Sequence, residues 1–184
     1  SFLSFAEKVK TYITENKVTD INSLEDSSLE EERKTLIQTI GENIQLRRIE
    51  TIDFTSEMKK GLYMHFDSKL AAIVITKDGS DEVARNVAMH VSAFNPLCLS
   101  EDDIDKDVLE REKAIFANQA QESGKPQEIM DKIVEGKVKR FLSEVSLLSQ
   151  DFVKDSEITV QEYLNQNSAI ALDFVRLKVG EGIE

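Results

Sequence analysis

Apolar residues spaced three or four positions apart predict helices at the start of the chain. Residues 2–13 carry Phe2, Phe5, Val9 and Ile13 at this spacing, and a second helix is predicted within residues 27–41. Ser28 and Glu31 have the spacing of a capping box, glutamates fill the first turn, and Gly41 is placed to end the helix. The triple glutamate 30–32 therefore suits a helix start better than a metal site.

An alternating pattern then predicts strands. Apolar and polar residues alternate from residue 43, which predicts a strand over 43–53, and the runs 61–66 and 70–77 predict a hairpin closed by a short polar turn. A helix is predicted over 81–93, since valines recur there at helical spacing and Pro96 follows. A last strand is predicted over 170–179.

The region 104–145 carries two apolar helical stripes separated by Gly124 and Pro126, which predicts an antiparallel helical hairpin. Gly136 lies within the second stripe, where glycine costs about 0.5–1 kcal/mol relative to alanine. We hypothesise that it lets the facing helix approach closely. Thr159 and Glu162 form a capping box for a short helix. Because strands and helices are partly segregated along the chain, the predicted fold class is α+β.

Composition narrows the classes of function. The chain has 184 residues and a net charge of −12, so its field disfavours nucleic acid as a direct ligand. No stretch approaches the roughly 20 apolar residues of a membrane helix, so no membrane partner is predicted. The single cysteine, Cys98, excludes an internal disulfide and a multi-cysteine zinc site, and a small buried hydrophobic role is expected for it.

Catalytic signatures are missing from the sequence. None of the common nucleotide-binding, zinc-binding or nucleophile motifs occurs, and we predict no catalytic residue, cofactor or metal. His90 is predicted to be a packed or surface histidine. His65 would share a strand face with Tyr63, which favours packing over a functional role. These observations favour a binding module over an enzyme.

The stretch 126–153, "PQEIMDKIVEGKVKRFLSEVSLLSQDFV", resembles the translation elongation factor Ts family. Three further segments resemble the same family in the same order. They are "IGENIQLRR" (40–48), "AMHVSAFNP" (88–96) and "FVRLKVGEGIE" (174–184). The resemblance implies a guanine-nucleotide exchange factor for the GTPase elongation factor Tu, in the bacterial cytoplasm or in an organelle.

The resemblance also implies two subdomains with small antiparallel sheets and an inserted helical hairpin. On this match, residues 1–57 form an incomplete first subdomain, residues 58–105 with 146–184 form the second, and residues 106–145 form the hairpin. The family's N-terminal helical module and its Thr-Asp-Phe-Val motif have no counterpart in this sequence, so we expect a core fragment with weak exchange activity. The strand at 43–53 would then be an unpaired edge that favours association.

Five residues match family positions that contact the GTPase. Ile40 and Gly41 match a loop beside the nucleotide-disturbing motif, His65 matches a Tyr-x-His motif, and Phe152 and Val153 match a segment leaving the hairpin. The residues after His65 depart from the family's glycine-containing pattern, and Lys154 replaces an apolar residue.

Two other functions remain open. The chain could be a homo-oligomerisation module without exchange activity of its own, since this region mediates self-association in some family members. A hydrolase using paired carboxylates is a third possibility, although no carboxylate in the sequence has a visible reason for a shifted pKa.

Overall fold

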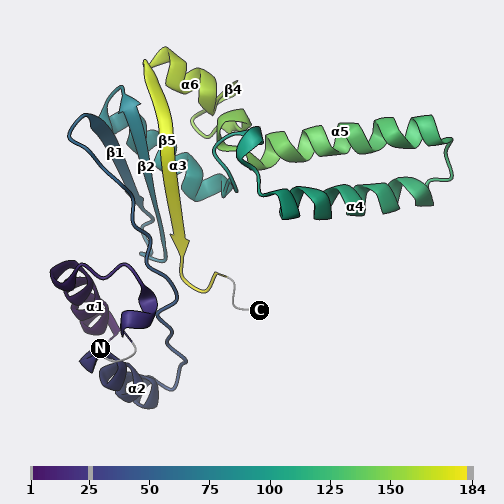
Figure 1. Ribbon diagram of the computed structural model, residues 1–184. Helices are drawn as coiled ribbons and strands as arrows, with labels where there is room; N and C mark the ends of the chain where they lie inside the picture. Colours follow the sequence, from purple (N-terminus) through teal and green to yellow (C-terminus); the bar gives the residue numbers. More distant parts are fainter. Residues whose placement is uncertain (1, 25–26, 182–184) are drawn as a thin grey trace. The chain divides into compact units, whose positions relative to one another are not determined.

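The computed structural model describes residues 2–24 and 27–181. They form two compact units, residues 1–53 and 54–184, and each unit is described by itself. The finer division into two subdomains at residue 57 and a separate hairpin remains a prediction. Figure 1 shows the elements of both units.

The first unit packs two helices on a small apolar cluster. It contains α1 (Phe2–Asn16), a short 3-10 helix (Ile21–Leu24) and α2 (Ser28–Ile40). The buried members of the cluster are Phe5, Val9, Leu24 and Leu29. Both predicted helices are confirmed, and α2 ends at Gly41, whose φ is 79° and whose N–H donates to the Ile37 carbonyl over 2.8 Å.

Two sequence predictions in this unit are wrong. The segment 43–53 is not a strand, because Ile44, Leu46 and Ile49 pack against the helical cluster and pair with no described strand. The Ser28 capping box is also absent. The N-cap residue is Ser27, and its hydroxyl donates to the Leu24 carbonyl over 2.6 Å instead of accepting from the helix.

The second unit is built on a three-stranded antiparallel sheet. Its strands are β1 (Met58–Met64), β2 (Leu70–Asp78) and β5 (Ala169–Lys178), in the order β1-β2-β5. Helix α3 (Asp81–Phe94) covers one face of this sheet (Figure 1). The predicted hairpin, helix and last strand are therefore confirmed. Val74, Val87 and Val91 are fully buried in the core between these elements.

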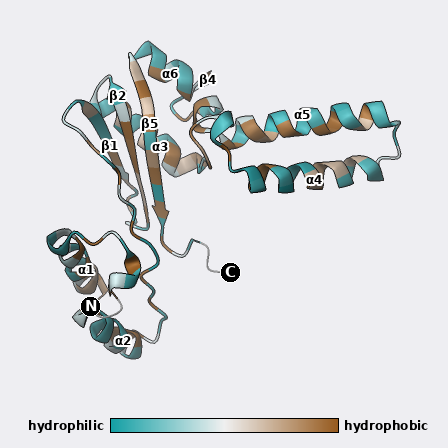
Figure 2. Cartoon of the chain, viewed as in Figure 1, coloured by the Kyte–Doolittle hydropathy of each residue, from teal (hydrophilic) through white to brown (hydrophobic). Residues whose placement is uncertain are grey.

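The helical hairpin is confirmed as α4 (Lys106–Glu122) and α5 (Gln127–Val145), preceded by a short 3-10 helix (Glu101–Asp103). Phe116 and Phe141 meet edge to face, with ring centroids 6.3 Å apart. Figure 2 shows hydrophobic residues concentrated on β2, β5 and α3, whereas α4 and α5 carry many hydrophilic ones. The close-approach hypothesis for Gly136 is wrong, because a Cβ there would meet nothing within 4 Å.

A small β-hairpin and a capped helix connect the helical hairpin to the last strand. After a 3-10 turn (Leu147–Ser149), β3 (Asp151–Phe152) pairs with β4 (Asp155–Thr159), a pairing that the sequence did not predict. Helix α6 (Val160–Gln166) follows. Its capping box is confirmed, since Thr159 Oγ1 accepts from the Glu162 N–H and the Glu162 carboxylate accepts from the Thr159 N–H.

None of the helices in the described ranges is both long and apolar enough to span a bilayer.

Candidate partner interface

The end of helix α2 exposes an apolar side chain beside a left-handed turn. Ile40 is 43% exposed although it is a large aliphatic residue. It comes immediately before Gly41, whose positive φ turns the chain away from the helix axis. A substituent on Gly41 would meet no atom within 4 Å, so the space beside this backbone is open. Such a corner can receive an apolar group of another protein.

His65 lies where strand β1 enters its turn. Its backbone N–H donates to the Leu70 carbonyl over 2.8 Å and closes the hairpin. Tyr63 Oη lies 3.4 Å from His65 Nδ1, which confirms that the two side chains share a strand face. The imidazole centroid is 4.4 Å from that of Phe66, whose side chain is 90% exposed. His65 thus combines packing against Tyr63 with a position beside an exposed aromatic ring.

Phe152 and Val153 differ sharply in exposure. The Phe152 ring is buried and stacks on Tyr163 with centroids 4.0 Å apart. Val153, which is 37% exposed, follows in the turn between β3 and β4. Lys154 Nζ donates to Asn86 Oδ1 over 2.7 Å and so ties this turn to α3. Only Val153 of the predicted pair can therefore present its side chain to a partner directly.

His90 is a buried polar residue beneath this turn. Its side chain is fully buried, and its Nε2 lies 2.9 Å from Gln150 Oε1. Burial lowers the pKa of His90, although the bond to Gln150 acts in the opposite direction. Of the two positions that the sequence left open for His90, packed or on the surface, the structure shows the packed one. No sequence signal predicted its contact with the turn that carries Val153, because the two residues come together only in the folded unit.

The structure places the five predicted residues in two separate units. Ile40 and Gly41 belong to the first unit, while His65, Phe152 and Val153 belong to the second. Within the second unit, no hydrogen bond or ring contact joins His65 to the segment 152–153. Within the second unit, His65 and the segment 152–153 therefore have separate hydrogen-bond and ring contacts.

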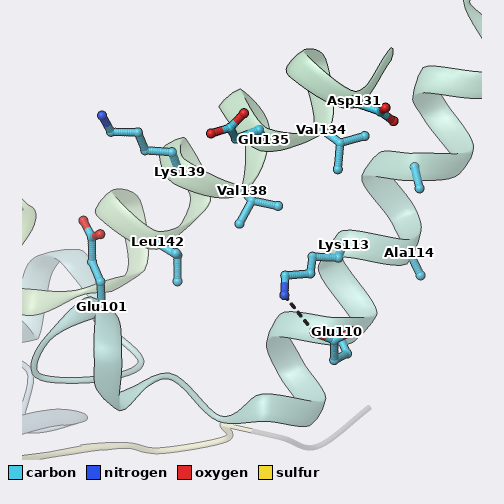
Figure 3. A pocket seen from close by; sticks show the side chains of 11 residues that line it. Glu101, Glu110, Lys113, Ala114, Asp131, Val134, Glu135, Val138, Lys139 and Leu142 are labelled. Carbon is cyan, nitrogen blue, oxygen red and sulfur yellow. Dashed lines mark hydrogen bonds and ion pairs between the residues drawn. The ribbon is translucent and has the colours of Figure 1, made fainter. Parts of the chain in front are cut away.

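A groove of about 700 Å³ runs between α4 and α5 (Figure 3). Apolar and charged side chains both line it. The apolar ones are Ala114, Ala117, Val134, Val138 and Leu142. Among the charged ones, Lys113 Nζ donates to Glu110 Oε1 over 2.8 Å. Among residues 2–24 and 27–181, no cluster of histidine, cysteine and acidic residues could hold a metal ion.

Comparison with known proteins decides the family. The sequence pattern of the elongation factor Ts family matches residues 1–181. This chain belongs to the elongation factor Ts family. The match extends over both units, so the agreement of the four motifs 40–48, 88–96, 126–153 and 174–184 is not a local similarity. The last three residues of the fourth motif lie outside the described residues.

Curated elongation factor Ts proteins align with most or all of the chain. The protein of Hahella chejuensis (strain KCTC 2396) is 41% identical over 184 residues, which is 100% of this chain and 63% of the relative. The protein of Francisella tularensis subsp. novicida (strain U112) is 47% identical over 155 residues, covering 84% of this chain and 52% of the relative. This chain therefore spans between half and two thirds of the length of these relatives.

Proposed function

We propose that this chain binds elongation factor Tu and promotes release of its guanine nucleotide, in the bacterial cytoplasm. The observation that carries the proposal is the family match over residues 1–181. The named relatives are bacterial elongation factor Ts proteins, and they align with this chain across both units. Because the chain spans only part of their length, its own binding and its own exchange activity are separate questions for experiment.

The proposed contacts are the exposed patches of the two units. Ile40 and Gly41 offer an apolar corner, His65 lies beside the exposed Phe66, and Val153 projects from the β3–β4 turn. The buried Phe152 contributes as an anchor that fixes the backbone next to Val153. Interfaces obtain most of their binding free energy from a few such side chains.

Exchange of this kind needs no covalent step. If the chain weakens nucleotide binding by a given factor, bound nucleotide weakens the binding of the chain by the same factor. We therefore expect the chain to bind nucleotide-free elongation factor Tu more tightly than the GDP-bound form. A protein with equal affinity for both forms could bind the GTPase without releasing nucleotide.

Calorimetry with the two forms of a bacterial elongation factor Tu tests binding, and fluorescent GDP release under excess unlabelled GDP tests exchange. We expect tighter binding to the nucleotide-free form and faster release than the intrinsic rate. The full-length Hahella relative serves as the positive control. If this chain binds neither form under conditions in which the relative binds both, the proposal is wrong.

Two exposed isoleucines give a matched pair of variants. Ile40 is 43% exposed at the proposed interface, and Ile129 is 46% exposed on α5 outside it. Truncation of either side chain to alanine removes little core packing. We expect Ile40→Ala to weaken binding about tenfold, equivalent to about 1.4 kcal/mol, and Ile129→Ala to leave it unchanged. The reverse result would indicate that the interface lies on the helical hairpin of α4 and α5.

Self-association is a second candidate function, supported by an exposed apolar sheet face. Met64, Ala71 and Leu177 lie opposite one another across the three strands, on the face away from α3. Met64 is 53% exposed and Leu177 is 39% exposed. In the next row Leu62 is 58% exposed. A continuous apolar face of this kind is typical of an interface with another chain.

The oligomeric state in solution tests this second candidate. If a second copy covers the face, sedimentation velocity will show a dimer that dissociates in a Leu62→Asp variant. A monomer at all concentrations would exclude it. This test uses no elongation factor Tu, so its outcome is independent of the exchange assay.

A further inference from the structure

Helix α3 presents two polar side chains, one turn apart, to the β3–β4 turn. Asn86 Oδ1 accepts a hydrogen bond from Lys154 Nζ over 2.7 Å. His90 Nδ1 lies 3.1 Å from the backbone nitrogen of Val153. Because residues four apart lie on the same helix face, the two side chains hold consecutive residues of one turn. The contact of His90 differs from that of Asn86 because it fixes the backbone.

Hydrogen-bond geometry determines the tautomer of His90. A backbone N–H can only donate, so Nδ1 must be the unprotonated acceptor for the Val153 N–H. In the neutral ring the hydrogen then lies on Nε2, which donates to Gln150 Oε1 over 2.9 Å. The Gln150 amide in turn donates to the Glu144 carbonyl over 2.6 Å. This chain of bonds is complete only when His90 is neutral.

Aromatic packing holds the imidazole in place. The ring of Phe94 stacks on it at a centroid distance of 4.6 Å, and that of Phe152 lies 6.0 Å away. The His90 side chain has no exposed surface. A buried, doubly bonded and stacked ring has little freedom to find other partners, so its Nδ1 stays directed at Val153.

We propose that neutral His90 is a positioning residue that fixes the Val153 turn in the conformation that binds elongation factor Tu. The inference rests on the proposed function, in which Val153 contacts the GTPase. His90 itself is buried and does not touch the partner. It acts by accepting a hydrogen bond from the Val153 N–H. If Nδ1 carried a hydrogen, two N–H donors would face each other and this bond would be lost.

The proposal implies a dependence on pH with a definite sign. Burial lowers the pKa of His90, so the folded unit favours the neutral ring. The imidazole bonds to Gln150 and to the Val153 N–H, while Lys154, the charged residue next in the same turn, bonds to Asn86. An unfolded chain binds the proton with the ordinary histidine pKa of about 6.5, so acidification below that value lowers the free energy of unfolding. Full protonation in the folded unit should release the turn.

Two variants separate the roles of the two ring nitrogens. In His90→Asn, the side-chain oxygen can lie near the position of Nδ1 and accept from Val153 without titrating. In His90→Gln, the amide reaches the position of Nε2 and leaves the Val153 N–H without its acceptor. Both variants lose the stacking on Phe94, so they form a matched pair for stability.

Nuclear magnetic resonance of the full chain gives a readout that needs no partner. We expect the Val153 amide of the wild type to be protected from exchange, relative to its intrinsic rate, near pH 7.5, and to lose this protection as His90 titrates below about pH 6.5. His90→Asn should keep the protection across this range, whereas His90→Gln should lose it about tenfold or more throughout. The ¹⁵N resonances of the wild-type ring test the tautomer without any substitution, so the inference stays testable if a variant unfolds.

Affinity for elongation factor Tu is the second readout. We expect His90→Asn to bind within about twofold of the wild type, and His90→Gln to bind about tenfold more weakly. Equal Val153 protection in both variants, or a ring that carries its hydrogen on Nδ1, would overturn the inference. If the wild type itself does not bind, the proposed function fails, whereas the Val153 amide still reports whether His90 positions the turn.

Discussion

Gly61 lies where strand β1 passes closest to helix α3. A Cβ built on it would approach the backbone carbon of Ala84 and the backbone nitrogen of Arg85 to 2.0 Å. Backbone atoms of a packed helix cannot move aside as the end of a flexible side chain can. Gly61 therefore sets the distance between the sheet and α3, the helix that carries His90.

We predict opposite effects on stability for two glycine substitutions. Gly61→Ala should lower the free energy of unfolding by about 1–3 kcal/mol or more, because α3 must shift away from β1. Gly136→Ala should raise it by about 0.5–1 kcal/mol, since alanine favours the helix and its methyl group meets no atom within 4 Å. Urea unfolding followed by circular dichroism measures both. A destabilising Gly136→Ala would indicate a contact at this helix that the single chain lacks.

Cys98 is predicted to be chemically inert in the native protein. Its side chain is buried, and burial raises the pKa of the thiol, so little reactive thiolate forms near neutral pH. Sγ lies 3.4 Å from Ser146 Oγ, and the backbones of Cys98 and Ser146 form an isolated β-bridge at the end of α5. We expect an aromatic disulfide reagent to react at least about tenfold more slowly with the native than with the urea-unfolded chain. A Cys98→Ser, Ser156→Cys double variant, whose thiol would lie on exposed β4, should react at the same rate in both states.

At the scale of elements, α6 depends on its N-terminal cap. The helix has only seven residues, yet its Val160 and Leu164 are fully buried in the core of the second unit. Thr159 and Glu162 exchange two hydrogen bonds, in which Thr159 Oγ1 accepts from the Glu162 N–H and the Glu162 carboxylate accepts from the Thr159 N–H. So short a helix gains little from its own backbone bonds and relies on this cap and on packing.

Loss of the cap should have a measurable cost. We predict that Thr159→Ala lowers the free energy of unfolding by about 1 kcal/mol, whereas Thr159→Ser, which retains the accepting oxygen, changes it by only a few tenths of a kcal/mol. Chemical denaturation of both variants measures the difference. Equal losses would assign the effect to the threonine methyl group and its packing.

Local patterns predicted the elements whose signals lie within a few residues. The Thr159 capping box, the Gly41 helix end and the turn between α4 and α5 are confirmed for this reason. The strand prediction for 43–53 is wrong because alternation indicates only which side chains are buried, and not what they are buried against. The side chains of Ile44 and Leu46 are shielded from water by packing against helices, as they would be by packing in a sheet.

At the scale of the whole molecule, the sequence predicts positions for an interface but does not predict how exposed each of them is. The resemblance selected Ile40, Gly41 and Val153 by position, and the structure shows that each offers exposed surface or open backbone space. The resemblance alone could not show that Phe152 is buried or that His90 accepts a hydrogen bond from Val153. Both facts depend on contacts between segments about 60 residues apart, such as the bond between His90 and Val153.

The two compact units should differ in local stability. Among the described residues, the apolar cluster of the first unit has four buried members and that of the second unit has twelve. Burial of apolar surface is the main favourable term in folding. We therefore predict that amides of α1 and α2 exchange with deuterium well before those of β2 and α3, at separate free energies of opening. Mass spectrometry of peptides from both units measures this order.

Phe5→Ala should speed exchange in residues 2–24 and 27–53 alone, while Val87→Ala should speed it in the second unit alone. Equal protection, or a response of both units to either substitution, would mean that they unfold as one cooperative body.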